Sequence, residues 1–578
     1  MRRAAAPVSR APSRRYLWAV PILTPSLRRA IVRAVIALAF AGAHVQAQTA
    51  SVPPLDEAYA DLDRLSELGF LDSVIVAQRP YSRREMGRIL RAARERSNQL
   101  GERSQSQLIT DLELSIGDGI LRRLEMRFSR EIEEIQPTDA LFKPVEDAQL
   151  AVYYTDVLRR GFVGTYGRTL EATMGSLLPR RLGTIPAAGT TTWLEISQRL
   201  EATSWLAFTL RERAQYAWAK DTALEGGTAE IVLGTMRMRY RNVALEIGRS
   251  QLSWAQSADE GLFIAADAPA LDLISLSSDE PFVLPSVLRV LGPTKATLFV
   301  ADLGPSQVRS HSKLLGYKVS ISPSPRAELG ASFFNHYGGE GGRPSSFGDR
   351  LIDFLPFVDI FRRHNYTDSS RALDVDSDKL LGLDGRLRIG GLRGVVLTGE
   401  LLIDDFDVRR IPKLFTGYGS QALGITLPRF ISPVLSLKLM ATHMGILTYT
   451  HSALSNGITT RGRLIGDELG PDAKAFGARL TWEPAAEVRL SIEGGSAIYS
   501  NAEYVTYYSD PENTRYVVQK TARTGDELRD RLGAHLLVQS QSGPSVSLRA
   551  MTERSRNFDF QGFRRTDSAA EINFRVPF

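Results

Sequence analysis

From about residue 149 onward, apolar and polar side chains alternate one by one through most of the chain. Val488, Leu490 and Ile492 fall on one side of an extended backbone, while Arg489 and Glu493 fall on the other. Strict alternation places one face of a strand in an apolar medium and the opposite face among polar groups. The pattern therefore predicts a mainly β fold for this part of the chain.

A soluble β-sandwich alternates in the same way, but three features favour a transmembrane barrel with lipid outside and a polar lumen inside. The polar faces are dense in arginine and glutamate, as a barrel interior requires. Long polar connections such as 335–384 contrast with short turns such as 483–486, a difference typical of the two rims of an outer-membrane barrel. The chain also ends on a strand whose one face carries Ile572, Phe574, Val576 and Phe578.

This ending resembles the C-terminal signature of bacterial outer-membrane barrels, which the barrel-assembly machinery reads, so Phe574 and Phe578 are the predicted assembly signal. Only a closed barrel lets strands cross a bilayer without unpaired backbone groups. At about ten spanning residues per strand, residues 148–578 predict a large antiparallel transmembrane β-barrel of about 16–18 strands.

A basic leader precedes the rest of the chain. The first 47 residues hold eight arginines and no Asp, Glu or Lys, and an apolar stretch at 30–43 leads to a small-x-small site ending at Ala47. This order predicts a secretory signal peptide, 1–47, cleaved before Gln48, with an N-terminal anchor helix as the alternative. Without the leader, Lys plus Arg falls from 71 to 63 against 65 acidic residues, so the formal charge of +6 becomes −2. The sequence therefore predicts no nucleic-acid partner.

Residues 48–147 predict a small periplasmic α-helical portion. A first helix is expected at 56–68, where apolar residues recur at three-residue steps between Pro53-Pro54 and Gly69. Ser82 and Glu85 form a capping box for a second helix, and a third is expected at 119–134. The charged groups around Arg83 and Glu131 are interpreted as solvated helix faces.

Motifs that would indicate chemistry are missing from the sequence. It contains no Gly-x-Ser-x-Gly elbow, no His-Glu-x-x-His pair, no Walker-type loop and no cysteine. The histidines are not spaced as metal ligands. We therefore predict no catalytic residue, no metal site and no cofactor. A Ser/His/Asp set gathered from separate strands around His443, His451 or His535 stays open, and would make the chain an outer-membrane barrel hydrolase.

Aromatic residues stand beside hydrogen-bonding residues in several connections. A saccharide presents hydroxyl groups and apolar ring faces, so its receptor needs aromatic platforms next to polar side chains. An aromatic girdle at the membrane interface, or ordinary loop packing, is the simpler interpretation of each residue. The polysaccharide-binding candidates are His336, Tyr337, Tyr449, His451, Tyr504, Tyr507 and Tyr508.

Several short segments stand in a consistent order along the chain, among them Leu55-Asp-Glu-Ala-Tyr59, Gly248-Arg-Ser-Gln-Leu-Ser-Trp254, Gly399-Glu-Leu-Leu-Ile-Asp404 and Ile465-Gly-Asp-Glu-Leu-Gly-Pro-Asp472. In this order they resemble segments of the Wzi-type capsule assembly family of outer-membrane proteins. The resemblance implies an eighteen-stranded, largely occluded barrel with a periplasmic helical bundle, which attaches or organises capsular polysaccharide without catalysis. One departure is Ala255-Gln256-Ser257, where a glycine-rich turn would be expected after the tryptophan.

The sequence as a whole predicts a non-enzymatic protein in the outer membrane of a Gram-negative bacterium, which binds or organises capsular or exopolysaccharide at the cell surface. Its expected partners are surface polysaccharide, outer-membrane lipid and the barrel-assembly machinery. An outer-membrane porin or transporter for small solutes is the first alternative, because the same alternation permits an open, wet lumen. The barrel hydrolase is the second.

Overall fold

The computed structural model describes residues 50–578 except 73, 104–110, 134–139, 159, 165–166, 175–176, 179–181, 183, 185–186, 257–260, 343–353, 355–376, 391–392, 405–418, 452–453, 455, 501, 509–515 and 523–524. The predicted leader, with Ala47 and Gln48, lies outside the described residues. Residues 46–578 form one structural unit.

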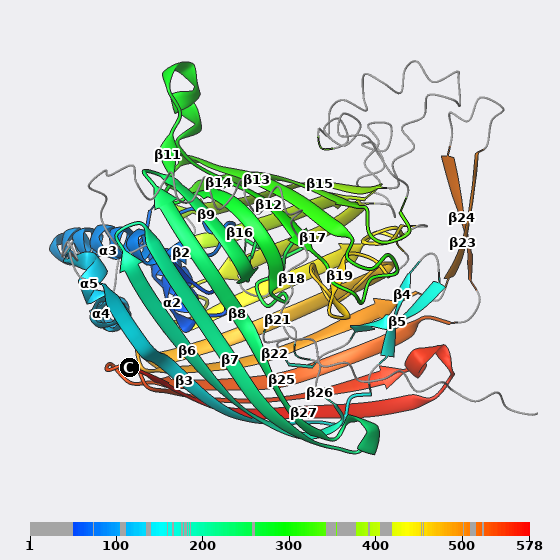
Figure 1. Ribbon diagram of the computed structural model, residues 1–578. Helices are drawn as coiled ribbons and strands as arrows, with labels where there is room; N and C mark the ends of the chain where they lie inside the picture. The colour runs from blue at the N-terminus through cyan, green and yellow to red at the C-terminus, as the bar shows by residue number, and fades with distance from the viewer. Residues whose placement is uncertain are drawn as a thin grey trace, which may run out of the picture. The chain divides into compact units, whose positions relative to one another are not determined.

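Eighteen long antiparallel strands close into a barrel in the described part of the chain (Figure 1). Each pairs with its neighbours along the chain, and the first and last strands, β3 and β27, pair to close the cylinder. Each barrel strand thus has a hydrogen-bonded neighbour on both sides, as lipid requires. The strands are β3 (Leu141–Thr155), β6 (Gly189–Thr203), β7 (Leu206–Ala219), β8 (Gly226–Tyr240), β9 (Val243–Ser250), β10 (Leu271–Ser278), β12 (Pro293–Asp302), β13 (Lys313–Ser324), β14 (Ala327–Tyr337), β15 (Ser377–Ile389), β16 (Val395–Ile403), β17 (Gly419–Leu427), β18 (Leu435–Met444), β21 (Ala473–Ala485), β22 (Val488–Tyr499), β25 (Glu527–Gln539), β26 (Ser545–Arg556) and β27 (Arg564–Pro577). The prediction of 16–18 strands is confirmed, and the first of them begins before the expected boundary at residue 148.

Shorter strands accompany the eighteen long ones. The two-residue β11 (Phe282–Val283) belongs to the barrel sheet, where it pairs with β12. Outside this sheet, β1 (Ser51–Val52) pairs with β2 (Tyr81–Ser82). Three hairpins belong to connections between barrel strands: β4 (Arg160–Gly164) with β5 (Gly167–Met174), β19 (Thr459–Thr460) with β20 (Arg463–Leu464), and β23 (Ala502–Tyr508) with β24 (Tyr516–Ala522).

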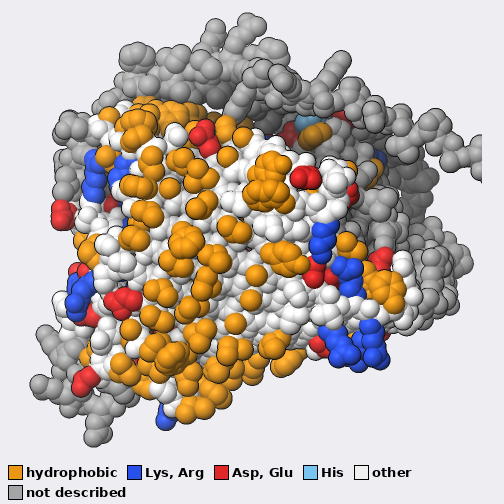
Figure 2. Space-filling view, turned by 90° about the horizontal axis from the view of Figure 1, so that it is seen from below, with side chains coloured by type: hydrophobic (Ala, Val, Ile, Leu, Met, Phe, Trp, Pro, Cys, Tyr) orange, Lys and Arg blue, Asp and Glu red, His pale blue; other side chains and the backbone are white. Residues whose placement is uncertain are grey.

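The wall of the barrel is apolar outside and charged inside. Leu532 is 59% exposed on the outer face, whereas the adjacent Arg531 turns inward and pairs with Glu553 on the next strand. Figure 2 shows one side of the wall, with apolar side chains spread across it and charged side chains gathered toward two edges. An apolar surface of this extent is stable in lipid rather than in water, so the transmembrane assignment of the alternating strands is confirmed.

The connections differ between the two rims, as the sequence indicates. Because consecutive strands are antiparallel, every second connection lies at the same rim, and Figure 1 shows the hairpins β4–β5 and β23–β24, which belong to two of the long connections, at the end opposite the helices. The long connections are 156–188, 251–270, 338–376, 404–418, 445–472 and 500–526, and the tight turns at the other rim include 204–205, 241–242, 325–326 and 486–487. Outer-membrane barrels turn their short connections to the periplasm, so we call the long-loop rim extracellular.

Four helices precede the barrel among the described residues: α2 (Glu57–Leu68), α3 (Arg83–Arg103), α4 (Asp111–Arg127) and α5 (Ser129–Ile132). The predicted caps are present, because the Asp56 carboxylate accepts from the Ala58 N–H at 2.9 Å and the Ser82 hydroxyl accepts from the Glu85 N–H at 3.1 Å. The third helix starts earlier than expected, at Asp111. None of the described helices is both long and apolar enough to cross a membrane.

These helices lie against the periplasmic rim and contact its turns. The Arg64 guanidinium donates to the carbonyl oxygens of Pro428 and Pro433, and Arg123 donates to the carbonyl oxygen of Ala486 at 2.8 Å. The interpretation of the charged groups at Arg83 and Glu131 as solvated faces is wrong: both are buried and they pair with each other. Charged side chains on a helix can be buried when the neighbouring helices and strand ends present charges of opposite sign.

Candidate functional site

Two long extracellular connections fold back into the barrel and meet there. We call residues 251–270, which follow β9, and 445–472, which follow β18, the plug. The Ala265 N–H donates to the Ile465 carbonyl oxygen at 3.1 Å, and the Tyr449 hydroxyl donates to the carbonyl oxygen of Leu262. One connection therefore holds the other across the lumen.

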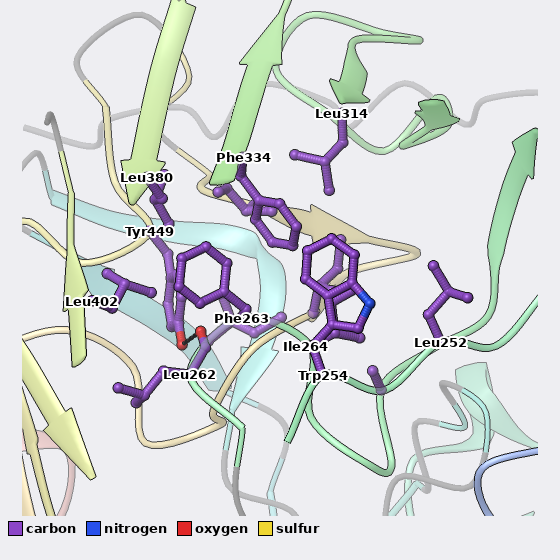
Figure 3. Packing of buried hydrophobic residues seen from close by; sticks show 14 of the residues in the cluster. Leu252, Trp254, Leu262, Phe263, Ile264, Leu314, Phe334, Leu380, Leu402 and Tyr449 are labelled. Carbon is purple, nitrogen blue, oxygen red and sulfur yellow. Dashed lines mark hydrogen bonds between the residues drawn. The ribbon is translucent and has the colours of Figure 1, made fainter. Parts of the chain in front are cut away.

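Aromatic rings fix the plug to the inner wall (Figure 3). The Trp254 ring lies 5.4 Å, centroid to centroid, from Phe299 on β12 and from Phe334 on β14, and Phe263 lies 5.0 Å from Phe334. A glycine on the wall makes room for the plug, since a Cβ at Gly382 would lie 2.1 Å from the Phe263 ring. The apolar plug residues thus pack in a defined position against strands β12 to β15.

Charged groups of the wall hold the backbone of the plug. The Glu400 carboxylate on β16 accepts from the N–H groups of Gln256 at 3.1 Å and Leu262 at 2.7 Å. The Gln256 amide donates to Asp384 at 2.6 Å, and the Lys318 ammonium pairs with the same carboxylate. The Ala255-Gln256 sequence that replaces the expected glycine-rich turn is therefore part of the attachment.

A third connection, 303–312, closes over the plug from the extracellular side. The Gln307 side-chain amide donates to the hydroxyl of Thr459 at 3.0 Å. The Asn456 side chain accepts from the Val308 N–H at 3.2 Å and donates to the Ser306 carbonyl oxygen at 2.9 Å. These contacts join β12 and β13 to the second half of the plug.

The segment between α2 and α3 enters the lumen from the periplasmic side. The Gln78 amide donates to the carbonyl oxygen of Lys295 at 2.9 Å, and the Glu328 carboxylate accepts from the N–H groups of Val76 and Ala77. Arg79 and Ser253 then exchange two backbone hydrogen bonds of 2.9 and 3.0 Å. The plug is thereby linked directly to the helical portion.

Between α2 and the plug, the lumen keeps a cavity of about 560 Å³, lined by charged and polar side chains. At its edge, the Asp56 carboxylate pairs with Arg127 of α4 and with Arg575 of β27 at 2.9 Å. Burial opposes ionisation of Asp56, but these two guanidinium groups outweigh it and hold its pKa well below the usual range. Among the described residues, helices, plug and paired charges occupy the lumen, whereas a porin requires an open passage.

Two of the predicted binding residues are buried. His336 is at the end of β14 rather than in a loop, is 0% exposed, and its Nε2 lies 2.8 Å from the Ser312 hydroxyl. Tyr449 is 2% exposed, because its hydroxyl bridges the two halves of the plug and also accepts from the Asp467 N–H at 3.0 Å. Neither side chain is accessible to a polymer outside the barrel in this arrangement.

The other candidates lie nearer the extracellular surface. Tyr337 is half-buried, with its ring 5.2 Å from that of Phe354, and His451 is half-buried and an electrostatic neighbour of His336. The three remaining tyrosines all lie in β23, the hairpin strand of the 500–526 connection, and their side chains lie outside the described part: Tyr504, Tyr507 and Tyr508. The structure thus places Tyr449 and His451 in the plug, with His336 of β14 an electrostatic neighbour of His451, and places the β23 residues on a separate hairpin.

The extracellular rim also carries a charged cluster that sequence reasoning missed. The Asp302 carboxylate at the end of β12 accepts from the Lys313 ammonium at 2.7 Å and from the Gly304 N–H at 2.8 Å, and lies 3.1 Å from His311 Nδ1. These residues flank one connection, but their spacing matches no motif. The only signal in the sequence is that Asp302 and Lys313 stand at strand ends.

One serine–histidine contact bears on the hydrolase alternative. His535 Nε2 lies 3.0 Å from the Ser547 hydroxyl, and both residues line the lumen cavity rather than the extracellular rim. Arg549 donates to His535 Nδ1 at 3.3 Å. A neutral imidazole with an accepting Nδ1 carries its proton on Nε2, so it donates to the serine and does not act as the base that a nucleophile needs. No group of three or more His, Asp or Glu side chains in the described ranges is placed to hold a metal ion.

A closed barrel with an apolar outer wall, a folded-in plug and helices at the periplasmic mouth defines an outer-membrane β-barrel with an occluded lumen. The model of the family described as "Capsule assembly protein Wzi" matches residues 188–567, more than half of the chain. The chain belongs to the Wzi capsule assembly family.

A solved structure shows the same fold. The structure of Wzi, described as an outer-membrane protein involved in group 1 capsule assembly in Escherichia coli and as a carbohydrate-binding β-barrel, aligns with a TM-score of 0.59 and 15% sequence identity, covering 91% of this chain and 99% of that one. Two Pseudomonas aeruginosa barrels, OprD and OpdL, align with a TM-score of 0.40 each, at 10% and 12% identity, over 76% of this chain and 95% and 98% of theirs, a likeness too slight to support an argument. None of the curated protein sequences matches the chain.

Proposed function

We propose that this protein is a non-enzymatic outer-membrane protein that binds or organises capsular or exopolysaccharide at the cell surface. The plug is the observation that carries the proposal. It closes the lumen toward the extracellular side, so this end of the barrel offers a surface for binding instead of the opening of a pore. Membership of the Wzi family and the description of the Escherichia coli protein as a carbohydrate-binding barrel support it.

The proposed binding surface is the extracellular rim above the plug. Tyr337, His451 and the tyrosines of β23 supply aromatic faces and hydrogen-bonding groups, the two features that sugar rings and hydroxyls need. The cluster of Asp302, His311 and Lys313 adds charged groups at the same rim. In this proposal His336 and Tyr449 hold the plug beneath the polymer instead of contacting it.

The remaining expected partners are part of the same proposal. Phe574 and Phe578 face outward from β27 and serve as the signal for the barrel-assembly machinery. The apolar wall contacts outer-membrane lipid, residues 1–47 direct export, the residues between this leader and β3 form the periplasmic portion, and the chain needs neither cofactor nor metal.

A binding experiment on the whole protein tests the polysaccharide proposal. The probe is the surface polysaccharide purified from the producing strain, with dextran as a neutral comparison polymer, and binding is measured by affinity electrophoresis. A tyrosine stacking contact contributes roughly 0.5–1.5 kcal/mol, so the combined Tyr504→Ala, Tyr507→Ala and Tyr508→Ala variant is expected to bind roughly tenfold or more weakly. Tyr216→Ala is the matched control, because Tyr216 lies on the outer wall.

Two results would contradict the proposal. If cells lacking the gene retain their surface polysaccharide as well as the parent strain, the polymer does not depend on this protein. If the purified protein gives steady, large openings in a planar bilayer, the lumen is a passage and the channel alternative holds.

A further inference from the structure

The connection between β10 and β12 forms an apolar projection at the periplasmic rim. We call residues 281–292 the finger. It consists of β11, paired with Thr294 and Pro293 of β12, and the 3-10 helix η3 (Ser286–Leu291). Pro285 precedes η3 and Gly292 ends it with φ +71, where a Cβ would lie 2.0 Å from the Ser322 carbonyl oxygen. The local sequence therefore fixes a defined bend at the tip of the hairpin.

The tip of the finger exposes branched aliphatic side chains. Val287 is 84% exposed and Val290 is 75% exposed, and Val283 and Leu288 are each about half exposed. Turn residues that meet water are mostly polar, glycine or proline. Aliphatic side chains exposed together in this way indicate contact with an apolar medium.

The base of the finger is held rigidly at the rim. The Asn242 side chain, in the β8–β9 turn, exchanges hydrogen bonds of 2.9 and 2.8 Å with the backbone of Glu280, and the Glu280 carboxylate pairs with Arg84 of α3. Asp279 pairs with Arg237 at 2.9 Å. The direction of the finger is thus set by the barrel, and Figure 1 shows it projecting away from the wall at the rim that carries the helices.

The apolar surface of the finger continues that of the wall. The strands on either side of it carry outward, exposed aliphatic residues, namely Leu276 on β10, Leu298 on β12 and Val319 on β13. A segment that leaves the wall sideways at this rim meets the periplasmic leaflet of the bilayer. Arg289 is exposed between the two valines, and an arginine flanked by aliphatic residues suits the boundary between acyl chains and lipid phosphates.

We propose that the finger is an interfacial lipid anchor, which inserts Val287 and Val290 among the phospholipids of the periplasmic leaflet and places Arg289 at their phosphate groups. This is independent of polysaccharide binding at the opposite rim. It gives the barrel a fixed point in the inner leaflet beyond its cylindrical wall.

Single-cysteine labelling tests the anchor, because the chain contains no cysteine of its own. Val287→Cys and Val290→Cys are labelled with NBD in the full-length protein and reconstituted into phosphatidylethanolamine–phosphatidylglycerol nanodiscs that contain lipids with a nitroxide near the headgroup. Leu298→Cys on the outer wall is the lipid-facing reference. Met126→Cys on α4 is the matched exposed control, since Met126 is 53% exposed on a helix away from the wall.

The expected result is quenching at both finger positions of at least half the extent seen at Leu298→Cys, with little quenching at Met126→Cys. Adding Val287→Asp to the Val290→Cys protein should reduce the quenching at least twofold, whereas Val308→Asp at the opposite rim should not. Unheated gel mobility confirms that each variant is a folded barrel.

Two outcomes overturn the proposal. Quenching at Val287→Cys no greater than at Met126→Cys would show that the finger lies in water. Emission that falls with rising protein-to-lipid ratio, independently of nitroxide lipid, would show that a second copy of the protein covers the finger instead of lipid.

Discussion

Removing the Glu400 carboxylate should release the first half of the plug without unfolding the barrel. Glu400 accepts the backbone N–H groups of Gln256 and Leu262, at either end of the turn between them, and contributes its own backbone to the β15–β16 pairing. A Glu400→Ala substitution leaves the strand pairing intact and two buried donors without this acceptor.

The size of the effect follows from the two bonds. A hydrogen bond to a charged group contributes about 1.5–3 kcal/mol net, so losing both costs the attached state roughly 3–6 kcal/mol. Every 1.4 kcal/mol is about a tenfold change in population. The fraction of molecules with this part of the plug detached should therefore rise on the order of 100-fold or more.

Hydrogen exchange measured by mass spectrometry reports this detachment directly. A peptide that covers residues 252–266 should exchange on the order of 100-fold faster in Glu400→Ala, and peptides from β21 and β22 should keep the parent rate. Glu400→Gln, which retains one acceptor oxygen, should be intermediate. Thr398→Ala is the matched control, because Thr398 lies on the same strand and face. Equal exchange of the 252–266 peptide in Glu400→Ala and Thr398→Ala, with both barrels folded, would refute the argument.

Three further predictions concern the periplasmic end and the last strand. Asp56→Ala leaves Arg127 and Arg575 without their shared carboxylate. Breaking such a buried pair costs about 3–5 kcal/mol. Limited proteolysis should therefore cut the α2–α4 region faster in this variant, while the barrel stays resistant. Because the pKa of Asp56 is depressed in the folded protein, its contribution to docking is present above the unfolded pKa of about 3.9 and is lost as the pH falls below that value through the folded pKa; proteolysis of the parent protein, but not of Asp56→Ala, should therefore accelerate on acidification in this range. Phe578→Ala should lower the yield of heat-modifiable barrel in cells at least several-fold, and an unchanged yield would remove Phe578 from the assembly signal.

The wall of the barrel was predictable from the sequence because the face on which a strand residue lies depends only on its position along the strand. An extended backbone alternates its side chains, so Leu532 and Arg531 had to lie on opposite faces once lipid and lumen were assigned. The helix caps at Asp56 and Ser82 were predictable for a similar reason, since capping depends on residues at most three positions away.

The plug was not predictable, because the direction in which a connection folds depends on the surface that it meets. Tyr449 stands between two threonines, Thr448 and Thr450, as a surface loop residue would, but its hydroxyl partner, the Leu262 carbonyl, lies far away in the sequence. Glu400 occupies an inward-facing position, as other glutamates of the barrel do. The neighbouring sequence does not show whether such a carboxylate contacts water or accepts backbone N–H groups of the plug. The available cue was the apolar run Leu262-Phe263-Ile264 within a connection, since such residues need a buried seat.

The position of Arg79 has a consequence for the order in which the molecule is built. Its backbone pairs with Ser253 inside the closed barrel, so the segment between α2 and α3 must be placed in the lumen during folding. The seam between β3 and β27 joins the earliest and latest strands, and therefore stays open until synthesis of the wall is complete. Until then the sheet is open between these two strands. The segment between α2 and α3 and the plug can therefore take their places in the lumen before β3 and β27 pair.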